Sequence, residues 1–199
     1  MKGSLIIIGF FLVGVACGVA HLLPTWITDY NFYVLCALLF AVGMSVGIDG
    51  SMVQRFRALN PRLVWLPLCS ILGTFAGSLV AWLLIADRGV TDILAVGSGF
   101  GYYSLSSILI TEYEGAELGT VALLANIVRE LFTLLGAPLM VRFFGTLAPI
   151  AAGGATAMDT TLPIISQTAG REYVPVSIYC GFVTDFSVPF LVTFFLSIS

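Results

Sequence analysis

A charged pair, Arg129 and Glu130, lies in the middle of an apolar run from about residue 118 to residue 141. About 20 apolar residues let a helix cross the hydrocarbon core of a bilayer, so this run predicts a membrane-spanning helix. A charge at that depth costs at least roughly 2.5–3.5 kcal/mol, so both side chains must face protein or water. Two interpretations stay open: a buried ion pair that joins two helices, and a site for transport or proton relay. The depth of the pair favours transport.

The composition agrees with a membrane protein. The chain is 59% hydrophobic and 10% charged, whereas soluble domains carry about 25% charged residues. It has no basic patch, so nucleic acid is not an expected partner. The four cysteines are widely spaced within apolar runs and the single histidine is isolated. The sequence therefore predicts no metal site and no cofactor, with protons as the suspected coupling ion, and it offers no nucleophile–base pair for an enzyme.

The other long apolar runs predict four more spanning helices, over about residues 4–23, 32–48, 63–86 and 174–198. Arginines 55, 57 and 62 lie between the second and third of these helices, and Lys2 precedes the first. Because positive charge marks cytoplasmic loops, this connection and the N-terminus are both expected in the cytoplasm. Five crossings then leave the C-terminus on the outside.

Two further segments, about 93–110 and 144–168, are too rich in small polar residues to be plain spanning helices. The first contains three glycines and four serines between residues 97 and 107. Irregular backbone at membrane depth is tolerated only where it is buried in protein or lines a watery cavity. We therefore predict broken or re-entrant helices, and whether these segments cross the membrane stays open.

The two broken segments suggest an inverted repeat. An offset of 56 residues places Gly153 on Gly97 and Asp185 on Arg129, and the predicted entry sides are opposite. Inverted repeats whose broken helices meet at the midplane are typical of secondary transporters. The predicted fold class is an all-α polytopic membrane protein with about five transmembrane helices and two broken segments. It forms a single transporter domain, with possible sub-units 1–62, 63–142 and 143–199.

Several polar residues near the breaks are candidates for a site. Asp185 lies near the middle of the last helix, either as a partner for Arg129 or as a cation or proton site. Asp159 lies in the second break, either as a helix N-cap or as a substrate contact. Asn126 lies one turn before Glu130 and is a plausible hydrogen-bond partner for it.

The breaks also predict a way to bind an amino acid. Half-helix N-termini near residues 104–107 and 160–161 would present free N–H groups to a carboxylate. The three acids could receive an ammonium group, and Tyr103 could line the same cavity or make a generic aromatic contact. Together these features suit a zwitterionic or dibasic amino acid. The candidate substrate- or proton-binding residues are Glu130, Arg129, Asp185, Asp159, Asn126, Ser104, Ser106, Tyr103, Thr160 and Thr161.

Three motifs resemble those of the bacterial lysine exporter LysO family: GSGFGYYSLSS from Gly97, NIVRE from Asn126, and ATAMDTTLP from Ala155. The resemblance covers most of the chain with the motifs in the same order. It implies an exporter of L-lysine, and of analogues such as thialysine, in the bacterial inner membrane. It also implies proton antiport that depends on intramembrane acids, with Glu130 on the acid of the family's R-E pair.

Full-length members of that family carry an additional N-terminal membrane portion with a further intramembrane acid. The resemblance therefore implies a small separate membrane protein that completes the transporter, or a homo-oligomer. Two alternatives remain: a structural subunit of a membrane complex, and a transporter or channel for another small amino acid.

Overall fold

The computed structural model describes residues 9, 13, 14, 16, 17, 44, 61–85 and 88–199. The helices predicted over 4–23 and 32–48, and the basic connection after them, lie largely outside these residues. In the described part of the chain every regular element is a helix and there is no strand. The all-α fold class is therefore confirmed.

Three helices are long and apolar enough to cross a membrane by length and composition, namely Leu63–Leu84, Ala116–Phe144 and Arg171–Ser197. They correspond to α4 (Leu66–Leu84) with the preceding 3-10 turn η2 (Pro61–Trp65), α7 (Ala116–Phe144), and α10 (Val174–Ser197) with the preceding turn η4 (Arg171–Tyr173). The spans predicted over 63–86, 118–141 and 174–198 are confirmed as long apolar helices.

The outer faces of these helices are apolar as well. On α10 four phenylalanines recur at every fourth position, and each is more than half exposed: Phe182, Phe186, Phe190 and Phe194. A helix that is apolar on its packed and on its exposed face is expected in lipid rather than in water. The protein is therefore a membrane protein, and this row of rings faces outward.

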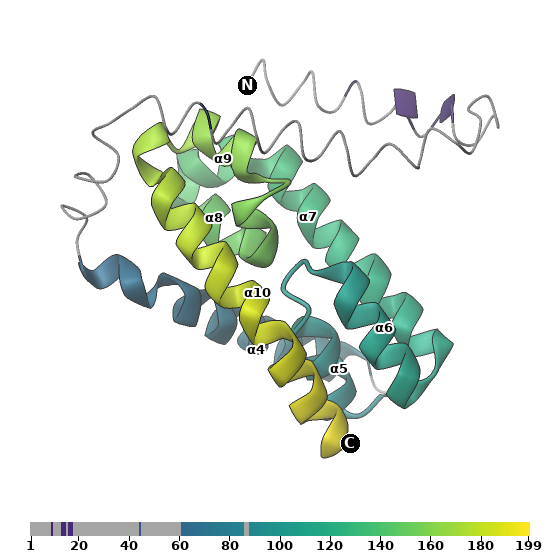
Figure 1. The fold of residues 1–199 in the computed structure, drawn as a ribbon. Helices are drawn as coiled ribbons and strands as arrows, with labels where there is room; N and C mark the ends of the chain where they lie inside the picture. The colour runs from purple at the N-terminus through teal and green to yellow at the C-terminus, as the bar shows by residue number, and fades with distance from the viewer. Residues whose placement is uncertain (1–8, 10–12, 15, 18–43, 45–60, 86–87) are drawn as a thin grey trace.

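The first broken segment is a re-entrant hairpin of α5 (Val90–Gly97) and α6 (Tyr103–Glu114). Its two outer ends lie at the same end of the molecule, next to the C-terminus (Figure 1). Asp92 at the start of α5 accepts a hydrogen bond from Ser199 at 2.8 Å. Arg88, just before α5, pairs at 2.6 Å with Glu117, just after α6. The segment therefore turns back without crossing the whole length of α10.

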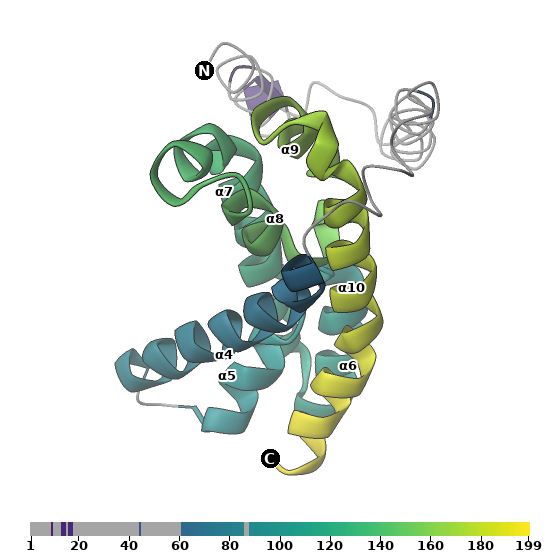
Figure 2. The same ribbon diagram turned by 90° about the vertical axis from the view of Figure 1, so that its left-hand side faces the viewer.

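The second broken segment enters from the opposite end. It comprises α8 (Ala148–Gly153), the 3-10 turn η3 (Gly154–Met158) and α9 (Leu162–Thr168). It begins where α7 ends and returns to the start of α10, and Figure 2 shows α8 between α7 and α10. The prediction of two broken segments is confirmed, and both are re-entrant in shape.

The tips of the two hairpins touch. The amide of Ala155 donates a hydrogen bond to the carbonyl of Phe100 at 2.9 Å, which joins η3 to the turn between α5 and α6. At the offset of 56, α5 and α8 end at the matched glycines 97 and 153. Oppositely entering hairpins that meet inside the protein are the pattern of an inverted repeat. The boundaries at residues 62 and 142 stay a prediction.

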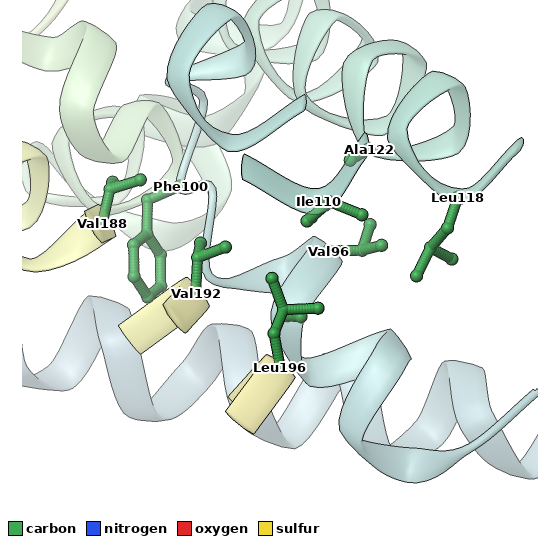
Figure 3. Close-up of a cluster of buried hydrophobic side chains, with 9 residues drawn as sticks. Val96, Phe100, Ile110, Leu118, Ala122, Val188, Val192 and Leu196 are labelled. Carbon is green, nitrogen blue, oxygen red and sulfur yellow. The ribbon is translucent and has the colours of Figure 1, made fainter. Parts of the chain in front are cut away.

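The core lies where the hairpins pack on α10. One cluster joins α5, α6, α7 and the C-terminal half of α10, as Figure 3 shows. It consists of Ala95, Val96, Phe100, Ile110, Leu118, Ala122, Val188, Val192 and Leu196. A second cluster joins the other hairpin to the N-terminal half of α10, and consists of Ile150, Ala157, Ile165, Ala169, Val176 and Cys180. Each hairpin thus packs on its own half of one long helix.

Gly181 allows α10 to approach the second hairpin closely. A methyl group at this position would lie 2.6 Å from the backbone nitrogen and from Cβ of Met158, so backbone atoms would have to move. We expect Gly181→Ala to lower the free energy of unfolding by about 1–3 kcal/mol, as overpacking does in other cores. The measurement is thermal unfolding in detergent. Gly136→Ala is the control, because its methyl group would meet a single flexible atom, Cε of Met140 at 3.4 Å. Equal effects of the two changes would contradict the expectation.

Candidate functional site

The site is built on the backbone crossing of the two hairpins. Phe100 and Gly154 both have positive φ values, of 45° and 60°. A methyl group on Gly154 would lie 2.5 Å from the carbonyl oxygen of Phe100 and 3.1 Å from Nη2 of Arg129. Glycine is therefore required at 154 both by its backbone angle and by the lack of space. The sequence showed the glycines but not which one meets the other hairpin.

Asn126 on α7 fixes the first break. Its Oδ1 accepts a hydrogen bond from the amide of Gly101 at 2.7 Å, and its Nδ2 donates to the carbonyl of Ala122 at 2.8 Å. Nδ2 also lies 3.4 Å from the carbonyl of Val96 and 3.4 Å from the hydroxyl of Ser106. The side chain is 3% exposed. Asn126 therefore satisfies buried backbone groups that the interruption of the helix leaves without helical partners.

Arg129, one turn further along α7, fixes the second break. Its Nε donates to the carbonyl of Ala152 at 2.8 Å and its Nη2 to that of Ala151 at 3.3 Å. Its Nη1 donates to the hydroxyl of Thr74 on α4 at 3.0 Å. The guanidinium carbon lies 5.7 Å from the centre of the Phe100 ring. Arg129 thus connects α4 with the tips of both hairpins.

These contacts overturn two of the interpretations made from the sequence. Asn126 forms hydrogen bonds with the first break rather than with Glu130. Arg129 donates its hydrogen bonds to carbonyl groups and a hydroxyl rather than to Asp185. Successive helical residues point about 100° apart, so neighbours in the NIVRE motif face different elements. Among the residues that the structure describes, the sole ion pair is that of Arg88 with Glu117. The buried ion pair considered for Arg129 and Glu130 does not form there.

Glu130 faces a cluster of acids instead. Its carboxylate lies near the side chain of Thr160 and within electrostatic range of Asp159. Asp185, from the middle of α10, also lies within electrostatic range of Asp159. All three side chains are half-buried, and Tyr103 lies close to Glu130 and Asp159. The tertiary structure thus brings three carboxylates together from α7, α10 and the second break.

The carboxylate of Asp159 accepts hydrogen bonds from the amide and the hydroxyl of its neighbour Thr160. It does not cap a helix: the N-cap of α9 is Thr161, which makes no side-chain capping bond. The hydroxyl of Thr161 donates instead to the carbonyl of Thr156 at 2.9 Å. The alternative that Asp159 is an N-cap is therefore wrong, because α9 begins too late for it. Asp159 is left at the acidic cluster.

The remaining candidate residues fall into two groups, those whose side chains are bonded within the fold and those whose side chains are exposed. Ser106 and Thr161 are buried and bonded to backbone carbonyls, whereas Ser104 and Tyr103 are exposed. The amides of Ser106, Thr160 and Thr161 already have acceptors within the protein. The free N–H groups predicted at these positions are therefore absent from these three residues, because the breaks are closed by turns of their own. The sequence also gave no signal for Thr74 or Phe100, whose roles depend on contacts between distant segments.

Arg129 also lines a groove of about 660 Å³ that runs between α4 and α7. Gly73 and Gly77 line it, and a methyl group on either would meet no atom within 4 Å among the described residues. Ala125 and Phe132 form the facing wall on α7. One wall of the groove is therefore a face of small residues on α4, and the described part of the chain leaves the groove open.

The acidic cluster can receive an ammonium group or protons. Its three carboxylates come from separate elements, and none of them is paired with a cation among the described residues. The crossing of broken helices around such a cluster is the arrangement of secondary transporters. Arg129 and Asn126 are not part of the cluster, because their side chains hydrogen-bond to the two breaks.

Comparisons with known proteins show which family the chain belongs to. The chain is 34% identical over 193 residues to the lysine exporter LysO of Escherichia coli (strain K12), covering 96% of this chain and 64% of that protein. It is 35% identical over 167 residues to a putative lysine exporter of Haemophilus influenzae, covering 84% of each chain. The chain thus spans less than two thirds of the Escherichia coli relative, and no solved structure matches it. A family model described as lysine exporter LysO matches residues 8–196, and the chain therefore belongs to the lysine exporter LysO family.

Proposed function

We propose that this protein exports L-lysine from the cytoplasm in exchange for protons. The observation that carries the proposal is the convergence of Glu130, Asp159 and Asp185 where the two re-entrant hairpins meet. A carboxylate cluster attracts the ammonium groups of lysine, and the same carboxylates can take up protons when lysine leaves. Export of analogues such as thialysine follows from the same recognition, since they carry the same charged groups. The names of the relatives support lysine as the substrate.

Within this proposal Glu130 is the residue that exchanges lysine for a proton. It belongs to a helix that is long enough to span the membrane, and its carboxylate faces Thr160 and Asp159 rather than lipid. Asp159 and Asp185 complete the cation site, with Tyr103, Ser104 and Thr160 at its edge. The two breaks are stabilised by hydrogen bonds of three buried side chains, those of Asn126, Ser106 and Thr161.

We propose a location in the bacterial inner membrane, with the N-terminus in the cytoplasm and the C-terminus in the periplasm. The support is the positive charge before residue 63 and the odd number of predicted crossings. We also propose that a small membrane partner or a second copy of the chain completes the transporter. The groove between α4 and α7, which the described residues leave open, supports this, because faces of small residues are where membrane helices pack closely.

The test is lysine counterflow in proteoliposomes, with internal pH recorded at the same time. We expect labelled lysine to exchange and to move protons in the opposite direction. The chain is reconstituted alone, crosslinked as an oligomer, and together with candidate small membrane proteins, which separates self-association from a partner. Exchange of a different amino acid would reassign the substrate. Absence of any exchange from folded protein in every reconstitution would leave a structural subunit as the function.

A further inference from the structure

Two glycines in the middle of α4 are not explained by contacts within the described part of the chain. Gly73 and Gly77 belong to the sequence GTFAG at the centre of an apolar span, and a methyl group on either would meet no described atom within 4 Å. Glycine weakens the interior of a helix relative to alanine. Gly119 and Gly181 differ from them, because a methyl group there would collide with α6 or with the second hairpin. What the glycines of α4 make room for therefore lies outside the described residues.

The same face of α4 carries small residues over most of its length. Cys69, Gly73, Gly77 and Ala81 recur at every fourth position, and all four line the groove between α4 and α7. α4 is also the least buried of the three long apolar helices: 17% of its most apolar stretch is buried, against 28% for each of the other two. It packs on α5, α8 and α10, and Figure 2 shows it projecting to one side of the molecule. The groove is therefore suited to a helix that approaches α4 closely.

A second copy of α4 matches this face. Small residues at every fourth position of an apolar helix are the pattern by which membrane helices pair with copies of themselves. The residues of α4 include no charged side chain, so two such helices can approach without repulsion. Two copies with the same orientation in one membrane have parallel α4 helices, and a two-fold axis brings the same patch of each copy together. The face is then its own complement.

We propose that α4 forms the interface of a homodimer, in which the α4 helices of two copies cross at Gly73 and Gly77 and each enters the groove of the other copy. The proposal rests on the proposed function for the need of a partner, and on the geometry of α4 for the identity of that partner. The second α4 also covers the groove where Arg129 lines it. Such cover is required because a charge next to lipid at this depth is costly.

The native Cys69 reports the contact, because it is exposed one turn before Gly73. The full-length protein with Cys17→Ser and Cys36→Ser keeps this thiol and that of Cys180, which is buried. Oxidation with copper phenanthroline in native membranes is expected to join two chains. Adding Cys69→Ser to the same background should abolish the product. A disulfide requires Cα atoms within about 7 Å of each other, so the product reports a direct contact.

The crossing itself is tested with Gly73→Ile and Gly77→Ile. The new side chains start in open space within the described part of their own chain, so the monomer should fold, but they hold the two helices apart. The crosslinked fraction is expected to fall at least about fivefold, as overpacking of a close contact predicts. Leu79→Phe is the matched control, because Leu79 is exposed on α4 and lies at least about 120° around the helix from both glycines. Its crosslinked fraction should equal that of the parent.

Thermal unfolding in detergent checks that the variants are folded. If the isoleucine variants are not, Gly73→Ala and Gly77→Ala replace them, and a smaller fall in the crosslinked fraction is expected. An unchanged fraction in the glycine variants would overturn the proposal, as would the absence of a Cys69 dimer. So would a crosslink from Cys69 to Cys17 or Cys36 of the same wild-type chain, or to a different protein, because another helix would then occupy the groove. If wild-type protein forms the Cys69 dimer but exchanges no lysine, the proposed function fails and the homodimer stands.

Discussion

Replacing Glu130 with glutamine is expected to lower proton-coupled lysine exchange by at least about 100-fold, in the range that loss of a positioned proton-transfer group costs. The change keeps the shape of the side chain and a polar group near Thr160. It removes the charge that would receive an ammonium group and the atom that would carry the proton. The measurement is counterflow in proteoliposomes, normalised to the amount of folded protein.

The control for Glu130→Gln is Glu117→Gln on the same helix. Glu117 is exposed and pairs with Arg88 at the surface, and exposed ion pairs contribute little to stability. Exchange by Glu117→Gln should match that of the wild type. Full exchange by Glu130→Gln would remove this carboxylate from the mechanism and would move attention to Asp159 and Asp185. Loss of exchange in both variants would indicate a general defect in reconstitution.

Replacing Asn126 with leucine is expected to destabilise the protein by about 1–3 kcal/mol, the cost of leaving buried polar groups unsatisfied. Leucine has a similar size but cannot accept the hydrogen bond of the Gly101 amide or donate to the first break. The first hairpin should then lose its fixed tip, so lysine exchange should fall together with stability. Thermal unfolding in detergent and counterflow, run on the same preparation, measure the two effects.

The matched control is Thr133→Val, on the same helix and equally buried. The Thr133 hydroxyl donates at 3.0 Å to the carbonyl of Arg129, within its own helix. Valine keeps the shape of the side chain and removes a bond that joins no two elements, so its effect should be small. A loss of stability as large as that of Asn126→Leu would mean that polarity within α7, rather than the contact with the break, is what stabilises the protein.

The sequence alone was sufficient for the three long helices that the structure describes and for the two breaks. Apolar length determines which segments can span a bilayer, and glycine and serine at membrane depth mark where a helix must be interrupted. Both are local properties, so α4, α7 and α10 and the breaks near Gly97 and Gly153 could be predicted without contacts. The three motifs that resemble the lysine exporter family also lie in the sequence, and the comparisons agree with them.

What each charged and polar side chain touches was decided by the tertiary structure. Asn126, Arg129 and Glu130 lie within five positions, yet they face the first break, the second break and the acidic cluster. Spacing along α7 gives the direction of each side chain around the helix but not which hairpin occupies that direction. That depends on how two distant hairpins enter from opposite ends and meet, so pairing Arg129 with Asp185 or Asn126 with Glu130 could not be tested from the sequence. The sequence by itself determined the helices and their interruptions, and the packing of the hairpins determined which polar groups became frame and which became site.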